Sequence, residues 1–135
     1  MLSYFLGEQQ QEISIIVATS GDTGSAVAHG FFNVPHVTVY VLYPSGKISH
    51  IQELQMTTLG GNIRAIEVDG TFDDCQRLVK QALTDAKLVA QKNLTTANSI
   101  NVGRLLPQIT YYAWAVAQLQ KQYHDKSISP VIVVP

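Results

Sequence analysis

The stretch ISIIVATSGDTG, residues 13–24, decides how this chain folds. It begins with a short run of apolar, mostly β-branched residues, which is typical of a buried strand. The run stops at a Thr-Ser-Gly sequence that favours a turn, and small residues with helical spacing follow it. The stretch therefore predicts a strand over residues 13–18, then a turn, then a helix from Ala26 to about Phe32.

The same alternation continues along the chain. Further strands are predicted over residues 37–43, 63–68 and 131–134, and helices over 49–59, 72–83 and 102 to about 122. Residues 85–96 have a weaker pattern, so we expect a partly helical or irregular connection into a short segment over 95–97. Pro107 predicts a bend in the last helix, or a helix that begins near it. Alternating strands and helices predict one three-layer αβα domain over residues 1–135, with a mainly parallel sheet.

Length and composition limit the classes of function that this chain could have. The 135 residues carry 9 basic and 10 acidic side chains, so no basic stripe is expected to bind nucleic acid. The single cysteine, Cys75, lies on the apolar face of its predicted helix and is expected to be buried. No signal peptide and no apolar run of about 20 residues is evident. These features predict a cytoplasmic chain that makes no membrane contact.

The turn at residues 19–24 is the first candidate binding site. It lies between a strand and a helix, where free backbone N–H groups and the helix dipole favour an anion. Its glycines let the backbone approach a ligand, and Ser20 and Thr23 add hydroxyl donors. The alternative is an ordinary turn in which Asp22 caps the helix.

A second polar cluster precedes the long helix. Asn98, Ser99 and Arg104 bring an amide, a hydroxyl and a guanidinium to one helix start, a combination suited to a phosphate group. The alternative is a capping loop with a solvated arginine. If both clusters lie at the same sheet edge, they predict a substrate that is negative at both ends.

Other site classes find less support. No set of cysteines and histidines has zinc-site spacing, and the glycines match neither common nucleotide-binding pattern. Asp22-Thr23-Gly24 matches the short signature of dimeric aspartic proteases, but those enzymes are nearly all β. A non-catalytic module that binds an anion or an amino acid stays open as an alternative function.

Taken together, four motifs in this order resemble the threonine synthase family. They are ATSGDTG at residues 18–24, LYPSGKIS at 42–49, LGGNI at 59–63, and ANSIN at 97–101 followed by RLLPQ at 104–108. The likeness covers roughly residues 1–120. It implies the small domain of a tryptophan-synthase-β-like, pyridoxal-phosphate-dependent enzyme that converts O-phosphohomoserine and water to threonine and phosphate.

The resemblance also implies roles for the two clusters. Ser20, Asp22 and Thr23 would hold the substrate carboxylate beside the cofactor, and Asn98, Ser99 and Arg104 would bind the substrate phosphate. Asp22 stands where many relatives have Asn near the phenolic oxygen of the cofactor.

Parts of the family pattern are missing. No lysine precedes Lys47, although the family's Schiff-base lysine lies upstream of the first strand. The glycine-rich loop for the cofactor phosphate would follow Pro135, and most of the second domain is absent too. We therefore expect a fragment that lacks the catalytic lysine, does not bind pyridoxal phosphate by itself, is inactive alone, and needs the rest of its polypeptide.

Overall fold

The computed structural model describes residues 11–97 and 102–124, except for the side chains of residues 102–105. The chain divides into two compact units, one ending at Ala97 and one beginning at Asn98. The predicted strand over residues 131–134 lies outside the described residues.

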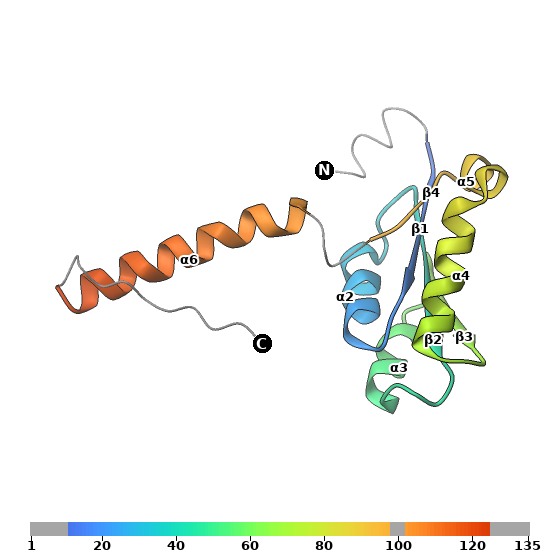
Figure 1. Ribbon diagram of the computed structural model, residues 1–135, viewed down its shortest axis with the longest axis horizontal. Coiled ribbons are helices and arrows are strands. Elements are labelled where there is room, and N and C mark those ends of the chain that lie inside the picture. The colour runs from blue at the N-terminus through green and yellow to red at the C-terminus, as the bar shows by residue number, and fades with distance from the viewer. Residues whose placement is uncertain (1–10, 98–101, 125–135) are drawn as a thin grey trace. The chain divides into compact units, whose positions relative to one another are not determined.

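A four-stranded parallel sheet forms the centre of the first unit (Figure 1). The strands run in the order β3-β2-β1-β4, with β2 paired to β1 and β3 along their lengths. Strand β4 pairs with the beginning of β1, where Ser14 lies opposite Leu94. The strands are β1 (Ile13–Ala18), β2 (Val37–Pro44), β3 (Ile63–Val68) and β4 (Leu94–Thr95). The prediction of a mainly parallel sheet is confirmed for the described residues.

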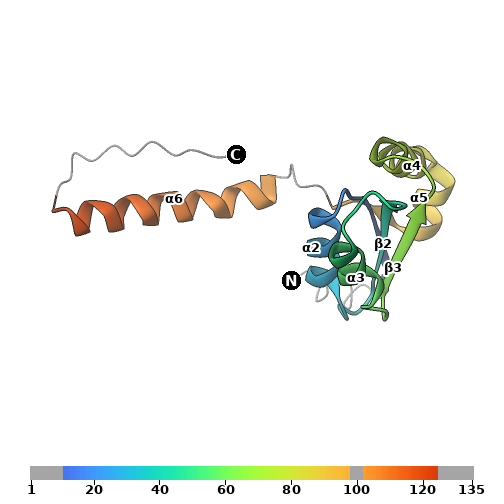
Figure 2. The ribbon, with the colours of Figure 1, turned by 90° about the horizontal axis from the view of Figure 1, so that it is seen from below.

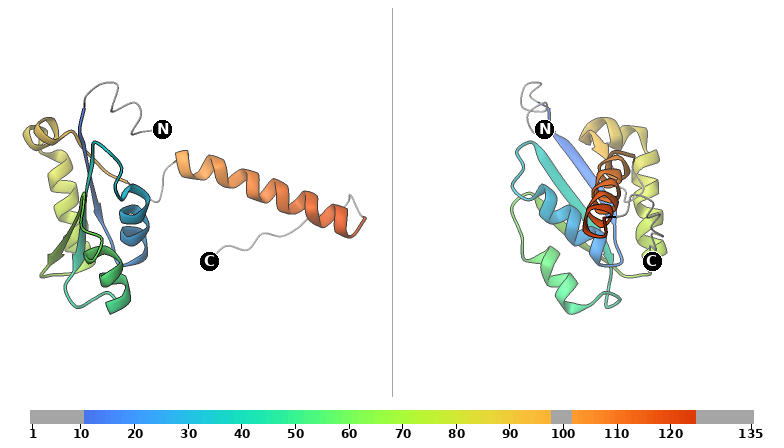
Figure 3. Two further views of the ribbon diagram at one scale, coloured as in Figure 1. Left: turned by 180° about the vertical axis from the view of Figure 1, so that it is seen from behind. Right: turned by 90° about the vertical axis from the view of Figure 1, so that its left-hand side faces the viewer.

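Helices cover both faces of this sheet. Helices α2 (Asp22–Phe31) and α3 (His50–Thr57) lie on one face, and α4 (Phe72–Thr84) lies on the other (Figures 2 and 3). The predicted three-layer αβα architecture is therefore confirmed. The strand order follows from it, because right-handed crossovers on one face carry the chain from β1 through β2 to β3, and a crossover on the other face returns it to the far side of β1.

Two apolar clusters hold the layers together. Under α2 and α3, the β-branched residues Val39 and Val41 of the central strand are fully buried. Under α4, Leu42 of the same strand packs with Cys75 and Val79. A strand buried on both faces needs a nearly continuous apolar sequence, as residues 37–43 have. The predicted burial of Cys75 is confirmed, and this desolvation, helped by the nearby Asp74 carboxylate, raises the pKa of its thiol.

The structure differs from the expectations in three places. Helix α2 begins at Asp22 and not near Ala26, so the residues between them, which were expected to form a turn, are helical. Residues 86–92 form a complete helix, α5 (Ala86–Lys92), whose N-terminal N–H groups donate to Asp85 Oδ1. It ends at Asn93, which adopts a left-handed conformation with φ of 45°. Strand β4 then occupies residues 94–95 and not 95–97.

The second unit contains helix α6 (Val102–Gln122), with Pro107 inside it. Helix α6 does not begin at Pro107, which is its sixth residue. The proline removes the N–H that would have donated to the carbonyl of Gly103, and the helix continues without this one hydrogen bond. Apolar side chains of this helix are exposed within the unit, and Leu106 and Ile109 each have 59% of their surface exposed. None of the helices in the described part of the chain is long and apolar enough to cross a membrane.

Candidate functional site

The turn between β1 and α2 is built around the side chain of Thr19. Its hydroxyl oxygen accepts hydrogen bonds from the backbone N–H groups of Gly21, at 2.9 Å, and Gly24, at 2.8 Å. Thr19 is only 1% exposed, and its own N–H donates to the carbonyl of Leu42 on the neighbouring strand. The turn is therefore anchored from inside by a buried hydroxyl group that belongs to the last position before the loop.

Both glycines of the turn occupy places that no larger residue fits. Gly21 is the N-cap of α2 with φ of 140°, a conformation that side chains rarely adopt. Gly24 has ordinary helical geometry, but a Cβ atom there would collide with the side chain of Thr19 and lie 2.8 Å from Val41 Cγ1. Helix α2 can approach the sheet this closely because Gly24 has no side chain.

This arrangement leaves two backbone donors open. Gly21 and Gly24 donate to Thr19, and the Ser25 N–H donates to the Gly21 carbonyl. Within residues 11–97 and 102–124, the N–H groups of Asp22 and Thr23 find no acceptor, as expected for the first turn of a helix. Ser20 and Asp22 are exposed and Thr23 is half-buried, so an anion can reach this end of α2.

Asp22 does not cap the helix as the alternative interpretation supposed. Gly21 is the N-cap, with no side-chain hydrogen bond, and Asp22 is the first helical residue. Its carboxylate instead accepts a hydrogen bond of 2.7 Å from Nε2 of Gln52, thirty residues along the chain. Gln52 belongs to the first turn of α3, so it ties the two helix starts together at one sheet edge.

Sequence reasoning missed Gln52. A signal was present, since Ser49 and Gln52 have the spacing of a capping box, and the structure forms that box around the start of α3. The pattern predicts a helix start at Ser49, but it does not reveal that the same glutamine also reaches Asp22. That contact depends on α2 and α3 packing side by side on one face of the sheet.

The turn lies where the winding of the sheet reverses. The chain leaves β1 toward β2 over one face, and it reaches β4, on the other side of β1, over the opposite face. In open parallel sheets, ligands bind at the carboxyl ends of two such strands. Both the β1–α2 turn and the residues after β4 follow strands of this pair. The geometry thus favours the first candidate cluster as a binding site.

The structure does not show where the side chains of the second predicted cluster, Asn98, Ser99 and Arg104, lie. Asn98 and Ser99 lie outside the described residues, and Arg104 is placed in α6 only by its backbone. The expectation that the two clusters face one cleft therefore stays a prediction.

Other polar side chains at this edge of the sheet connect the ends of neighbouring strands. Ser45 Oγ donates to a Glu67 carboxylate oxygen at 2.5 Å, linking the ends of β2 and β3. Burial, together with the charges of Glu67 and Glu53, raises the pKa of Tyr43 beside them. Lys47 is exposed on the loop after β2.

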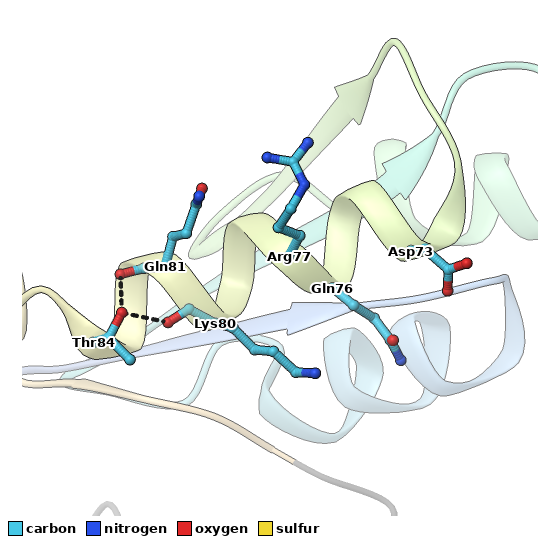
Figure 4. A pocket seen from close by; sticks show the side chains of 6 residues that line it. All are labelled: Asp73, Gln76, Arg77, Lys80, Gln81 and Thr84. Carbon is cyan, nitrogen blue, oxygen red and sulfur yellow. Dashed lines mark hydrogen bonds between the residues drawn. The ribbon is translucent and has the colours of Figure 1, made fainter.

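A separate hollow of about 400 Å³ lies along the outer side of α4 (Figure 4). All the residues that line it come from this one helix, so it is a depression between exposed side chains and is distinct from the β1–α2 turn. In the part of the chain that the structure describes, no three histidine, cysteine or acidic side chains come together as metal ligands.

Comparison with known proteins supports the resemblance. No family model matches the chain. It is 50% identical over 131 residues to threonine synthase of Escherichia coli (strain K12), which covers 97% of this chain and 30% of that enzyme. It is 42% identical over 127 residues to threonine synthase of Saccharomyces cerevisiae, covering 93% of this chain and 24% of the yeast enzyme. The chain thus spans about 30% or less of the length of these relatives.

Solved structures agree. A threonine synthase from Brucella melitensis with bound pyridoxal phosphate superimposes with a TM-score of 0.80 at 38% identity, covering 88% of this chain and 26% of that one. The Escherichia coli threonine synthase superimposes with a TM-score of 0.74 at 52% identity, covering 87% and 28%. The resemblance to a segment of threonine synthase, and the fold that it implied, are therefore confirmed.

Proposed function

We propose that this chain is a segment of a threonine synthase and contributes the substrate-binding edge of its small α/β domain. The complete enzyme would convert O-phosphohomoserine and water to threonine and phosphate. The observation that carries the proposal is 50% identity to such an enzyme over 131 residues, on a parallel sheet whose first turn has open N–H donors. Nothing observed favours the alternative of a non-catalytic binding module.

The β1–α2 turn is proposed to bind the substrate carboxylate. The open N–H groups of Asp22 and Thr23 lie at the positive end of α2, and the Ser20 hydroxyl is exposed beside them. Backbone donors held this way need no reorganisation when the anion arrives. The turn is preorganised because the Thr19 hydroxyl is buried and holds both glycines in place.

Asn98, Ser99 and Arg104 are proposed to bind the substrate phosphate. The support is chemical, because an arginine fork with amide and hydroxyl donors suits phosphate oxygens. Strand β4 is parallel to β1, and in the sequence this cluster follows β4 and Ala97. The two anionic ends of O-phosphohomoserine would then be held by residues that follow neighbouring strands.

The described residues fit only part of a pyridoxal phosphate site. The Asp22 carboxylate is proposed to lie near the phenolic oxygen of the cofactor, but its known partner is the Gln52 amide. We propose that none of the lysines of this chain forms the imine with the cofactor, and the first of them in the sequence, Lys47, lies on an exposed loop. The cofactor would supply the electron sink, and residues elsewhere in the enzyme would anchor it.

The role of this chain is therefore orientation and charge stabilisation. The turn and Arg104 would fix both ends of the substrate, which sets the direction of the carbon chain between them. We propose that the chain alone is inactive, that its partner is the remainder of the same polypeptide, and that the enzyme works in the cytoplasm without nucleic acid or membrane contact. The aspartic protease alternative finds no support, since Asp22 begins a helix beside a parallel sheet.

A chimera tests this function. The 131 aligned residues of this chain replace the matching segment of Escherichia coli threonine synthase, and the product is expressed in a strain that lacks the enzyme. We expect growth without added threonine, and release of phosphate from O-phosphohomoserine by the purified protein. The 135-residue chain by itself is expected to give neither. A soluble chimera that takes up pyridoxal phosphate and forms no threonine would refute the proposal, and an active isolated chain would refute the division of roles.

A further inference from the structure

The side-chain amide of Gln52 is held in one orientation by its partners. Its Oε1 accepts from the Ser49 N–H at 3.1 Å and from the Ser49 hydroxyl at 3.0 Å. These two contacts use both acceptor positions of the oxygen. The amide nitrogen must then face the other way, where Nε2 donates to Asp22 Oδ1 at 2.7 Å. The reverse orientation would bring the amide oxygen against a carboxylate and would lose the hydrogen bonds with the Ser49 N–H and with Asp22.

The same amide covers the backbone of the turn. A Cβ atom at Gly21 would lie 2.5 Å from both Cδ and Nε2 of Gln52, so the amide group rests directly over this glycine. Gly21 is accordingly buried, although it lies between the exposed residues Ser20 and Asp22. Thr19 thus holds the turn from the sheet side, and Gln52 holds it from the α3 side.

The contact also decides where the Asp22 charge lies. A carboxylate in the first turn of a helix is attracted to the free N–H groups there. Within residues 11–97 and 102–124, no backbone N–H donates to the Asp22 carboxylate, and its hydrogen bond comes from Gln52. A carboxylate that folded back onto the helix start would occupy the place proposed for the substrate.

We propose that Gln52 is a positioning residue for the binding of the substrate carboxylate. It holds the Asp22 carboxylate away from the open N–H groups of Asp22 and Thr23, and it fixes the Gly21 turn from which they point. This inference rests on the proposed function, since it concerns the same substrate.

The capping box offers a variant that separates this role from a purely structural one. Glutamate serves as well as glutamine in a capping box, so Gln52→Glu keeps the acceptor for Ser49 and leaves the start of α3 intact. It removes the donor to Asp22 and places a second carboxylate beside it. Ser49→Ala is the control variant with the opposite effect. It removes the serine hydroxyl that caps α3, and it keeps both partners of the Gln52–Asp22 hydrogen bond.

The variants are made in the active chimera with Escherichia coli threonine synthase. For Gln52→Glu we expect the KM for O-phosphohomoserine to rise by about tenfold, because the released Asp22 carboxylate competes with the substrate carboxylate for the open N–H groups. The kcat should change less than about threefold, because binding and not chemistry is affected. The thermal midpoint should fall in this variant, because the Gln52–Asp22 hydrogen bond is replaced by two facing carboxylates. Ser49→Ala should lower the midpoint and leave KM unchanged.

Asp22→Asn combined with Gln52→Glu exchanges donor and acceptor, and it should recover part of the KM lost in the Gln52→Glu variant. An unchanged KM in Gln52→Glu, or an equal rise in Ser49→Ala, would overturn the positioning role. A separate readout is the nuclear magnetic resonance signal of the Gln52 side-chain amide, which should shift in Asp22→Asn. An inactive parent chimera would refute the proposed function, whereas an unshifted signal would refute the Gln52 contact itself.

Discussion

The hydroxyl oxygen of Thr19 accepts a hydrogen bond of 2.8 Å from the backbone N–H of Gly24, five residues further along the chain. The same oxygen accepts from Gly21, so one buried side chain holds both glycines of the turn. If the N–H groups of Asp22 and Thr23 bind the substrate carboxylate as proposed, a side chain on the ligand side of the turn could not cap them without blocking that site. Capping from the interior holds the turn and leaves the site open.

Thr19→Val tests this anchor. Valine keeps the shape of the side chain and leaves the N–H groups of Gly21 and Gly24 without an acceptor. We expect a loss of about 1–3 kcal/mol in the free energy of unfolding, measured with urea. Thr19→Ser retains the hydroxyl and should cost less. A valine variant as stable as the parent, beside a destabilised serine variant, would show that the methyl group matters and the hydrogen bonds do not.

Gly24→Ala and Gly30→Ala form a matched pair within α2. Alanine is favoured over glycine in helices by about 1 kcal/mol. At Gly30 nothing lies within 4 Å of an added Cβ, so this variant should gain about 0.5–1 kcal/mol. At Gly24 the Cβ meets Thr19 and Val41, so overpacking should outweigh the propensity and cost about 1–3 kcal/mol. Thermal unfolding of both variants should therefore give shifts of opposite sign.

Asn62 explains part of the LGGNI motif. Its Nδ2 donates to the carbonyls of Phe31 and Val37, both at 2.8 Å, and its Oδ1 accepts from the Asn33 N–H at 2.8 Å. Asn62→Asp keeps the acceptor, removes both donors and points a carboxylate at two carbonyls. We expect it to lower the free energy of unfolding by about 1–3 kcal/mol and to be at least as damaging as Asn62→Ala. A milder effect in the aspartate variant would mean that the acceptor is the important group.

The start of α4 should make stability depend on pH. The N–H and the hydroxyl of Thr71 each donate to Asp74 Oδ2 at 2.8 Å, and Arg77 pairs with Oδ1 at 3.0 Å. The Thr71 bonds, above all the backbone one, and then Arg77, lower the pKa of Asp74 to about 2. The carboxyl of an unfolded chain has a pKa of about 3.9, so the unfolded state takes up this proton first as the pH falls.

The contribution of Asp74 is therefore fully present above about pH 5 and is lost as the pH falls through 4 toward 2. Asp74→Asn should lower stability at neutral pH and flatten this part of the curve of unfolding free energy against pH. Asp73→Asn leaves the three hydrogen bonds in place and should preserve the slope. An unchanged slope in Asp74→Asn would show that other carboxyl groups control the acid response.

Arg104→Ala, made in the chimera, tests the proposed phosphate contact. Losing a charge-assisted pair should weaken O-phosphohomoserine by about 10- to 100-fold. A competing amino acid without a phosphate should lose far less, because it does not use the guanidinium. Competition measurements with both compounds separate these outcomes. Equal weakening of the two would count against a phosphate role for Arg104.

The elements were largely predictable from local patterns. The strands over residues 13–18 and 63–68 have the predicted boundaries, because short β-branched runs between turn residues have few other solutions. Residues 85–96 were expected to be partly helical or irregular, and the extent of helix α5 was not predictable because its seven residues give too little periodicity. Its clearest signal was the cap at Asp85. The early start of α2 was missed because Thr23 and Gly24 are poor helix formers, and their conformation is imposed by the Thr19 hydrogen bonds and by packing on Val41.

The order of apolar runs and turn residues was enough to determine the alternating strands and helices and the chemistry of the loop after the first strand. Both depend on the period of neighbouring residues and on backbone groups that every helix start exposes. Only the packing of the layers determined three features of the tertiary structure. These are the pairing of β4 with β1, the hydrogen bonds from Asn62 to residues 31–37, and the hydrogen bond from Gln52 to Asp22. Each joins segments at least 25 residues apart, and a local pattern carries no information about which distant side chain will fill the space beside it.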